Sequence, residues 1–114
     1  MSDCIFCKIA NKEIPTEMVY EDEYVVAFKD LNPQAPIHVL IIPKKHVETV
    51  VDLTEDDELL VGKMFSAARK IAKKYDIEEK GFRLIVNCKE DAGQEVMHLH
   101  FHILAGQKLG TKII

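Results

Sequence analysis

The residues best suited to chemistry are His98, His100 and His102, which occupy alternate positions near the end of the chain. Side chains of an extended strand alternate between its two faces, so the three imidazoles are expected to share one face. Outer strand faces usually carry Thr, Lys, Glu or Arg, whereas an imidazole can be a nucleophile, a proton carrier or a metal ligand near neutral pH. The pattern therefore predicts a functional surface, and it predicts that the opposite face, formed by Met97, Leu99, Phe101 and Ile103, is buried.

This histidine row is too long to hold a single metal ion. In a strand, the Cα atoms of His98 and His102 would lie roughly 13 Å apart. Each ring nitrogen of a zinc site must lie about 2.0–2.1 Å from the metal. We therefore expect the two ends of the row to have different roles.

A second set of chemical residues begins with Cys4 and Cys7, whose C-x-x-C spacing is typical of metal ligands. His46 and His98 would complete a Cys2His2 zinc site, which leaves His100 and His102 to face a substrate. Two alternatives remain open. The cysteines could be reduced thiols on a terminal helix, or a redox dithiol, although no thioredoxin-like βαβ pattern surrounds them.

Three weaker signals lie near the row. His38 starts a predicted strand and could approach the row from a neighbouring strand. Asn87 offers a donor and an acceptor just before the row, and Gly93-Gln94-Glu95 could present backbone N–H groups to an anion. The chain has no P-loop and no G-x-G-x-x-G motif, so a nucleotide would be held differently from those folds.

The elements predicted to position these residues are mostly strands, with few helices between them. The sequence predicts a short helix from Cys4 to about Asn11 with Asp3 as its cap, and one long helix after the N-cap Thr54. Leu60, Met64, Ala67, Ala68, Ile71 and Tyr75 recur at helical spacing and form the apolar face of the long helix. Strands are predicted at residues 18–21, 24–29, 37–42, 82–88 and 96–104. This order indicates an α+β domain built on a five-stranded antiparallel sheet.

Composition narrows the class of protein. A chain of 114 residues that is 47% hydrophobic is expected to form a single domain, 1–114, with one core. Its net charge of −4 argues against nucleic acid as a partner. No signal-peptide pattern or membrane-spanning run is present in the sequence, and three cysteines do not make a disulfide framework, so we expect a cytoplasmic protein without a membrane partner.

With these residues in place, the chain resembles the histidine triad (HIT) family, in its Hint branch of purine nucleoside phosphoramidases. The signature stands at His98-Leu99-His100-Phe101-His102-Ile103-Leu104. Further matching segments are Ile5-Phe6-Cys7-Lys8-Ile9, Lys12-Glu13-Ile14-Pro15, Ala27-Phe28-Lys29-Asp30, Pro33-Gln34-Ala35-Pro36, Ile42-Pro43-Lys44-Lys45-His46 and Gly93-Gln94. These segments occur in the same order as in the family, and the resemblance covers nearly the whole chain.

The resemblance implies a homodimer with joined sheets and a site for a purine nucleoside monophosphate or phosphoramidate. Asp30 would bind the ribose, and His100 would be the nucleophile, assisted by His102, His38 and Gln94. The base pocket would be formed by Ile5, Phe6, Ile9, Phe28 and Leu31, and the phosphate site by Asn87, Gly93, Gln94, Glu95, His100 and His102. Related proteins with paired cysteines place zinc at the positions of Cys4, Cys7, His46 and His98.

The resulting hypothesis is hydrolysis of a P–N bond through a covalent nucleotidyl-histidine. The alternatives are a nucleotide-binding regulatory or scaffold protein with little turnover, a zinc hydrolase, and a dinucleoside polyphosphate hydrolase. Two positions depart from many relatives: Glu95 stands where a serine is common, and the tail after Lys108 lacks a Trp-Pro-Pro ending.

Overall fold

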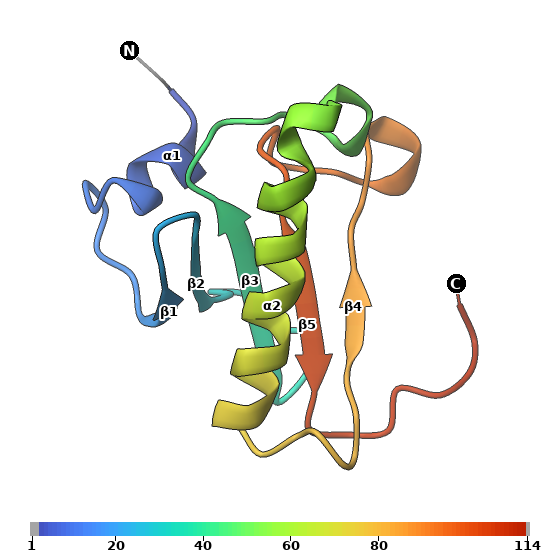
Figure 1. The fold of residues 1–114 in the computed structure, drawn as a ribbon. Helices are drawn as coiled ribbons and strands as arrows, with labels where there is room; N and C mark the ends of the chain where they lie inside the picture. Colours follow the sequence, from blue (N-terminus) through green and yellow to red (C-terminus); the bar gives the residue numbers. More distant parts are fainter. Residues whose placement is uncertain (1–2, 114) are drawn as a thin grey trace.

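The computed structural model describes residues 3–113 and has one sheet with a helix on each face (Figure 1). Its strands pair antiparallel in the order β1-β2-β3-β5-β4. The elements are α1 (Ile5–Ala10), β1 (Met18–Glu21), β2 (Val25–Lys29), β3 (Ile37–Pro43), α2 (Glu58–Lys74), β4 (Arg83–Ile85) and β5 (Phe101–Ala105), with 3-10 turns at Val50–Asp52, Glu55–Asp57 and Glu90–Ala92. The predicted α+β class, with one long helix, one short helix and five antiparallel strands, is confirmed.

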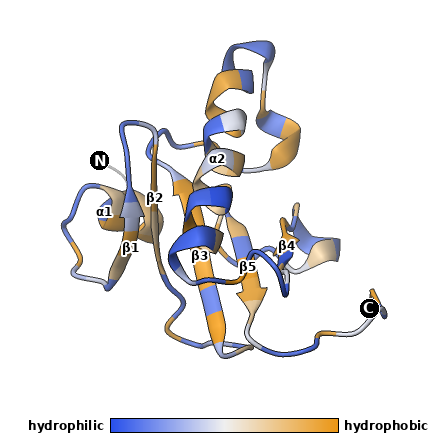
Figure 2. Ribbon diagram, turned by 60° about the horizontal axis from the view of Figure 1, so that its bottom comes forward, coloured by the Kyte–Doolittle hydropathy of each residue, from blue (hydrophilic) through white to orange (hydrophobic). Residues whose placement is uncertain are grey.

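The central strands are apolar on both faces, because each face is covered by a helix. Alternate residues divide between two clusters. The cluster under α2 includes Val25, Ala27, Val39, Ile41 and Ile103. The cluster under α1 contains Phe6, Ile9, Ala10, Val26, Phe28, Leu40 and Ile42. Figure 2 shows the hydrophobic colouring concentrated on these central strands.

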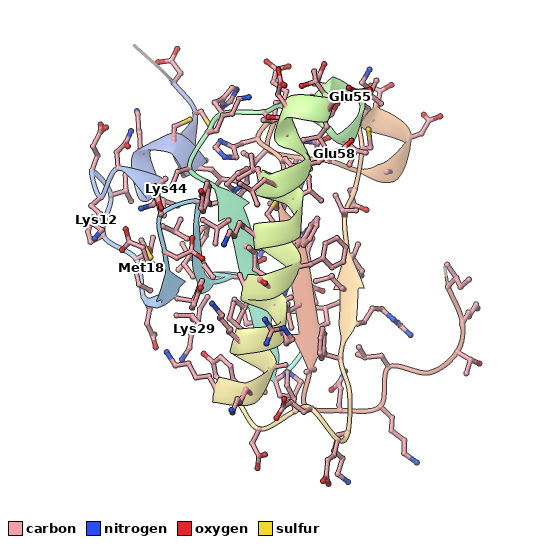
Figure 3. The ribbon with its side chains drawn as sticks, viewed as in Figure 1. Lys12, Met18, Lys29, Lys44, Glu55 and Glu58 are labelled. Carbon is pink, nitrogen blue, oxygen red and sulfur yellow. The ribbon has the colours of Figure 1, made fainter. Side chains whose placement is uncertain are left out.

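The long helix α2 has the predicted apolar stripe, since Leu60, Met64, Ala67, Ala68 and Ile71 are all buried. Thr54 caps the turn Glu55–Asp57, and α2 itself begins one turn later at Glu58, as the labels in Figure 3 show. The Thr54 backbone N–H donates a hydrogen bond to Asp57 Oδ2, which completes a capping box. Within residues 3–113, neither helix has both the length and the apolar character needed to cross a membrane.

The short helix α1 is capped differently from the prediction. Cys4, not Asp3, is the N-cap, and its Sγ accepts a hydrogen bond from the Cys7 backbone N–H at 3.4 Å. Cysteine is not among the preferred N-cap residues, which are Ser, Thr, Asp and Asn, so helix capping alone does not explain its presence here. Beyond α1, Lys12 and Lys44 both reach the Glu21 carboxylate, at 2.9 and 3.1 Å, and tie the helix exit to the sheet (Figure 3).

The segment that carries the histidines is only half a strand, which corrects the prediction. β5 begins at Phe101, so His98 and His100 precede it. The predicted burial is confirmed for Leu99, Phe101 and Ile103, which are 1%, 5% and 0% exposed, but Met97, expected to be buried, is 43% exposed. Residues 97–100 lie outside the ladder, and the Leu99 N–H bonds to the Val47 carbonyl at 2.7 Å. The preceding strand is likewise shorter than predicted, spanning 83–85 instead of 82–88.

Candidate active site and metal cluster

A cavity of about 270 Å³ lies on the α1 side of the sheet and contains most of the predicted nucleotide residues. Helix α1 forms one wall, and the strands and the 87–96 loop form the others. The lining residues are Ile5, Phe6, Ile9, Thr16, Phe28, Lys29, Asp30, Leu31, Leu40, Asn87, Gly93, Glu95, Val96, His100 and His102. Of the predicted nucleotide residues, only Gln94 is missing from this set.

Phe6 connects the apolar part of the cavity with the histidines. Its ring meets Phe28 edge to face with centroids 5.6 Å apart, and it meets His100 in the same way at 5.1 Å. Phe6 and Phe28 are buried, whereas Ile5 and Leu31 are 48% and 93% exposed. The apolar end is therefore a slot with two buried phenylalanine rings at its bottom and two accessible side chains at its rim. This shape suits a flat aromatic ligand.

His100 is held in one tautomer by the backbone. Its Nδ1 lies 2.8 Å from the His98 carbonyl oxygen, which can only accept, so Nδ1 carries the proton. The lone pair is then on Nε2. Because His100 also lines the cavity, this nitrogen has a lone pair that could act as a nucleophile there.

His102 has the opposite tautomer, set by a short hydrogen-bonded chain. The Gln34 backbone N–H donates to His38 Nδ1 at 3.0 Å, so the His38 proton is on Nε2. His38 Nε2 lies 2.9 Å from His102 Nδ1, which must then accept. His102 consequently carries its proton on Nε2, as a hydrogen-bond donor beside the nucleophile. The predicted approach of His38 from the neighbouring strand is present, since β3 pairs with β5.

Burial keeps His102 and His38 neutral. It lowers the pKa of His102 to about 4, with smaller contributions from His100 and His38. Burial also lowers the pKa of His38, although the Asp30 carboxylate opposes the shift. At neutral pH His102 therefore presents a neutral imidazole N–H to the cavity, with a neutral His38 behind it.

Asp30 stands where β2 ends and lines the same cavity. Its Oδ1 accepts a hydrogen bond from the Asn32 backbone N–H at 2.8 Å, and its Oδ2 lies 3.3 Å from His38 Nε2. These contacts fix the carboxylate while leaving lone pairs for a ligand, since two carboxylate oxygens can accept about four hydrogen bonds.

Gln94 does not line the cavity because its side chain binds the backbone on all sides. Its Nε2 donates to the Glu48 and Val96 carbonyls at 2.7 and 3.0 Å, and its Oε1 accepts from the Lys89 N–H at 2.8 Å. Lys89 and Gly93 have φ values of 68° and 80°, so the loop between them is tightly wound. Gln94 thus fixes the shape of the loop that carries Gly93 and Glu95.

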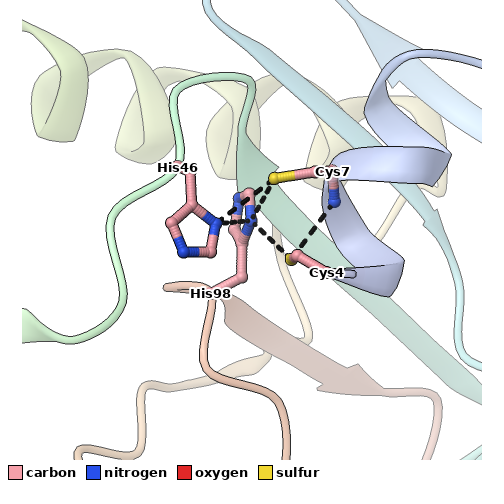
Figure 4. Close-up of side chains that lie close together, drawn as sticks. All are labelled: Cys4, Cys7, His46 and His98. Carbon is pink, nitrogen blue, oxygen red and sulfur yellow. Dashed lines mark hydrogen bonds between the residues drawn. The ribbon is translucent and has the colours of Figure 1, made fainter. Parts of the chain in front are cut away.

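The predicted metal ligands Cys4, Cys7, His46 and His98 come together at the start of α1 (Figure 4). Cys4 Sγ and Cys7 Sγ lie 3.3 and 3.5 Å from His98 Nδ1, and His46 Nδ1 lies 3.2 Å from both Cys7 Sγ and His98 Nδ1. A tetrahedral zinc ion separates its ligand atoms by about 3.3–3.8 Å, given its bond lengths. The residues present therefore fit a metal ion.

The orientation of His98 supports the same interpretation. Its Nε2 lies 2.8 Å from the Pro43 carbonyl oxygen, which fixes the proton there and leaves Nδ1 as a ligand. Such a backbone acceptor is the usual partner of a metal-binding histidine.

Four cavity residues were missed by the sequence analysis: Thr16, Lys29, Leu40 and Val96. Leu40 could have been found, because it follows His38 at the period of a strand. Thr16 could not, since only the pairing of β1 with β2 brings residues near position 16 to the cavity.

The antiparallel sheet supports the histidine row, a further histidine lies on the next strand, and an apolar slot lies beside these histidines. Together these features define the histidine triad class of protein. The chain belongs to the HIT family: the family model, described as HIT domain, matches residues 11–109. It is 47% identical over 111 residues to the purine nucleoside phosphoramidase of Escherichia coli K12, an alignment that covers 97% of this chain and 93% of that protein.

Solved structures of other proteins support this family assignment. A histidine triad protein from Clostridium difficile is 52% identical with a TM-score of 0.95, and the match covers 98% of this chain and 97% of that one. A HIT family hydrolase from Clostridium thermocellum is 48% identical with a TM-score of 0.96, and the match covers 100% and 99% of the two chains. The similarity therefore extends through both the fold and the full length.

Proposed function

We propose that this protein hydrolyses the P–N bond of purine nucleoside 5′-phosphoramidates, with His100 as the nucleophile. The observation that carries the proposal is the fixed pair of tautomers: His100 presents an Nε2 lone pair and His102 an Nε2–H to one cavity. The similarity to a purine nucleoside phosphoramidase supports the choice of substrate.

The nucleotide would extend from α1 to the loop after β4. The purine would enter the slot between the buried residues Phe6, Ile9 and Phe28 and the rim residues Ile5 and Leu31. Asp30 would accept hydrogen bonds from the ribose hydroxyls. The phosphate would lie against His100 and His102, with Asn87, Gly93 and Glu95 around it, while Gln94 acts by shaping the loop.

The reaction would proceed in two displacements. In the first, His100 Nε2 bonds to phosphorus and the P–N bond breaks, while the His102 Nε2–H hydrogen-bonds the leaving group and the leaving nitrogen takes its proton from solvent. In the second, water attacks phosphorus, the bond to Nε2 breaks, and the water gives its proton to solvent. The products are a nucleoside monophosphate and an amine.

Zinc bound by Cys4, Cys7, His46 and His98 would have a structural role. Four protein ligands complete a tetrahedral site and leave no position for a substrate water. The metal would hold α1, and with it Phe6, against the segment that carries His100. This arrangement favours a histidine nucleophile over a zinc-activated hydroxide.

The protein would act as a homodimer. Phe65 of α2 and Phe82, just before β4, are 54% and 38% accessible, around a cavity lined also by Ala68, Ala72 and Leu84. Exposed apolar surface of this kind is typical of an interface.

The decisive variant is His100→Ala. Turnover of a fluorogenic purine nucleoside phosphoramidate should fall at least about 1,000-fold, since covalent catalysis is lost, while zinc content and nucleoside monophosphate binding persist. His100→Gly should recover part of the turnover with added imidazole. Intact mass measurement of quenched wild-type protein should show one nucleotidyl adduct per chain.

The same assay separates the other candidates. A wild type that binds nucleotide without turnover would be a regulatory protein, and one that prefers dinucleoside polyphosphates would belong to that class of hydrolase. Near-normal turnover by His100→Ala would rule out the histidine nucleophile.

A further inference from the structure

A buried hydroxyl without a partner lies in the wall of the nucleotide cavity. Among the side chains of residues 3–113, Thr16 Oγ1 is the one buried nitrogen or oxygen for which no hydrogen-bond partner is present. Thr16 also lines the cavity. Buried hydroxyls are normally paired, because the free energy lost by removing them from water is otherwise not recovered.

The sheet order places Thr16 at the end of the cavity remote from the phosphate site. Met18 pairs with Phe28, and the Lys29 N–H bonds to the Glu17 carbonyl at 3.2 Å, so Thr16 lies beside the end of β2. His102 is on β5, three strands away from β1. At a spacing of about 4.8 Å, three steps separate the two ends by roughly 14 Å, comparable to the length of a nucleoside monophosphate.

The other polar residue at this end is already paired. Lys29 lines the cavity, but its Nζ lies 2.7 Å from Glu17 Oε2, in an ion pair at the edge of the sheet. Lys29 and Met18, both labelled in Figure 3, mark this edge. Ile9, Phe28 and Leu31 also line the cavity and are apolar, and the Asp30 carboxylate contacts the Asn32 N–H and His38, so among the described residues Thr16 Oγ1 is the buried polar atom left without a partner.

We propose that Thr16 recognises the polar substituent at C6 of the purine base. C6 lies at the end of a purine remote from the phosphate, and Thr16 lies next to β1, three strands away from the strand of His102. Rotation about χ1 exchanges the methyl and hydroxyl groups of a threonine between staggered positions and turns the hydroxyl toward the ligand. A hydroxyl accepts a hydrogen bond from the 6-amino group of adenine and donates one to the 6-oxo group of guanine. Thr16 thus favours 6-substituted purines without choosing between these two, an inference that rests on the proposed function.

The test compares Thr16→Val, which keeps the shape and removes the hydroxyl, with Thr16→Ser, which keeps the hydroxyl. Calorimetry would measure binding of adenosine, guanosine and purine riboside 5′-monophosphates; the last has no substituent at C6. Thr16→Val should weaken binding of the first two by roughly five-fold, the equivalent of one hydrogen bond, and leave purine riboside monophosphate unchanged. Thr16→Ser should retain the wild-type preference.

A second measurement distinguishes recognition from packing. Because Thr16→Val removes an unpartnered hydroxyl, it should raise the midpoint of thermal unfolding of the ligand-free protein, whereas Thr16→Ser should not. Equal binding of all three nucleotides by wild type and Thr16→Val would overturn the role of Thr16. An equal loss for all three would do the same, since it would indicate packing alone. A wild type that binds none of them would instead refute the proposed function.

Discussion

At the scale of single residues, backbone groups decide which nitrogen of each triad histidine is available. The carbonyls of Pro43 and His98 fix the protons of His98 and His100, and the Gln34 N–H acts on His102 through His38. The lone pairs therefore alternate along the chain: Nδ1 of His98 faces the cysteines, and Nε2 of His100 is left for the cavity. One sequence motif thus contributes to a cluster that could hold a metal ion and to the proposed catalytic site, whose requirements differ.

The pKa of His102 leads to a prediction about pH. Because this pKa is about 4 in the folded protein and about 6.5 in an unfolded chain, the unfolded state binds more protons between these values. The free energy of unfolding should therefore fall as the pH falls from 6.5 toward 4. Glutamine does not titrate in this range. Between pH 7 and pH 5 the free energy of unfolding of His102→Gln should therefore fall by on the order of 1 kcal/mol less than that of wild type, after allowance for solvent screening.

Urea unfolding at the two pH values would measure this difference. Any loss of metal in acid affects both proteins equally, since both retain the Cys4–His98 cluster, so the comparison isolates His102. An identical pH dependence in the two proteins, or a histidine NMR titration of His102 near pH 6.5, would contradict the assignment.

At the scale of elements, the strands and helices followed from local sequence, but the course of the histidine segment did not. Period-two and period-3.6 patterns depend on neighbouring residues, and so β1, β3 and α2 were predicted within a few positions. The segment from Val96 to His100 follows non-local contacts instead. His98 turns toward α1, some 90 residues earlier in the chain, and Leu99 bonds to Val47.

The same reasoning explains which site residues could be found from sequence. His38, His46, Cys4 and Cys7 were recognisable by type and spacing, and the structure brings each to its expected neighbour. The backbone clamp made by Gln94 and the position of Thr16 depend on loop geometry and sheet order, which no local pattern contains.

The metal cluster gives a prediction about α1. A helix of six residues is too short to be stable alone, so it depends on its attachments. Cys7→Ser should reduce zinc from about one ion per chain to a small fraction and lower the midpoint of thermal unfolding, because metal binding contributes directly to folding free energy. Cys88→Ser is the matched control, since Cys88 lies outside the cluster.

Elemental analysis and thermal unfolding of the purified variants would check this expectation. Turnover should also fall in Cys7→Ser, because α1 carries Phe6 against His100. A wild-type protein that is folded, active and free of metal would defeat the prediction.

At the scale of the whole molecule, the two faces of the sheet are covered unequally. α1 and the cavity lined by His100 and His102 lie on one face, and α2 crosses the other without covering its β4 side (Figure 1). In residues 3–113, β4 pairs only with β5, so its outer edge presents unpaired backbone groups. An exposed edge next to exposed phenylalanines is an aggregation hazard for a monomer, and an ordered partner removes it.

A second copy of the chain could cover this edge. A two-fold axis beside β4 would join two sheets and bury both copies of Phe65 and Phe82. Light scattering at micromolar concentration should therefore give a mass near twice 13.0 kDa. Phe65→Glu places a charge in that contact and should shift the mass toward the monomer. Leu31→Glu adds the same charge at a side chain that is 93% exposed, on the cavity side, and should leave the mass unchanged. If Phe65→Glu remains a dimer, the interface lies elsewhere, and if the wild type is a monomer, the edge of β4 must be protected by its own short length.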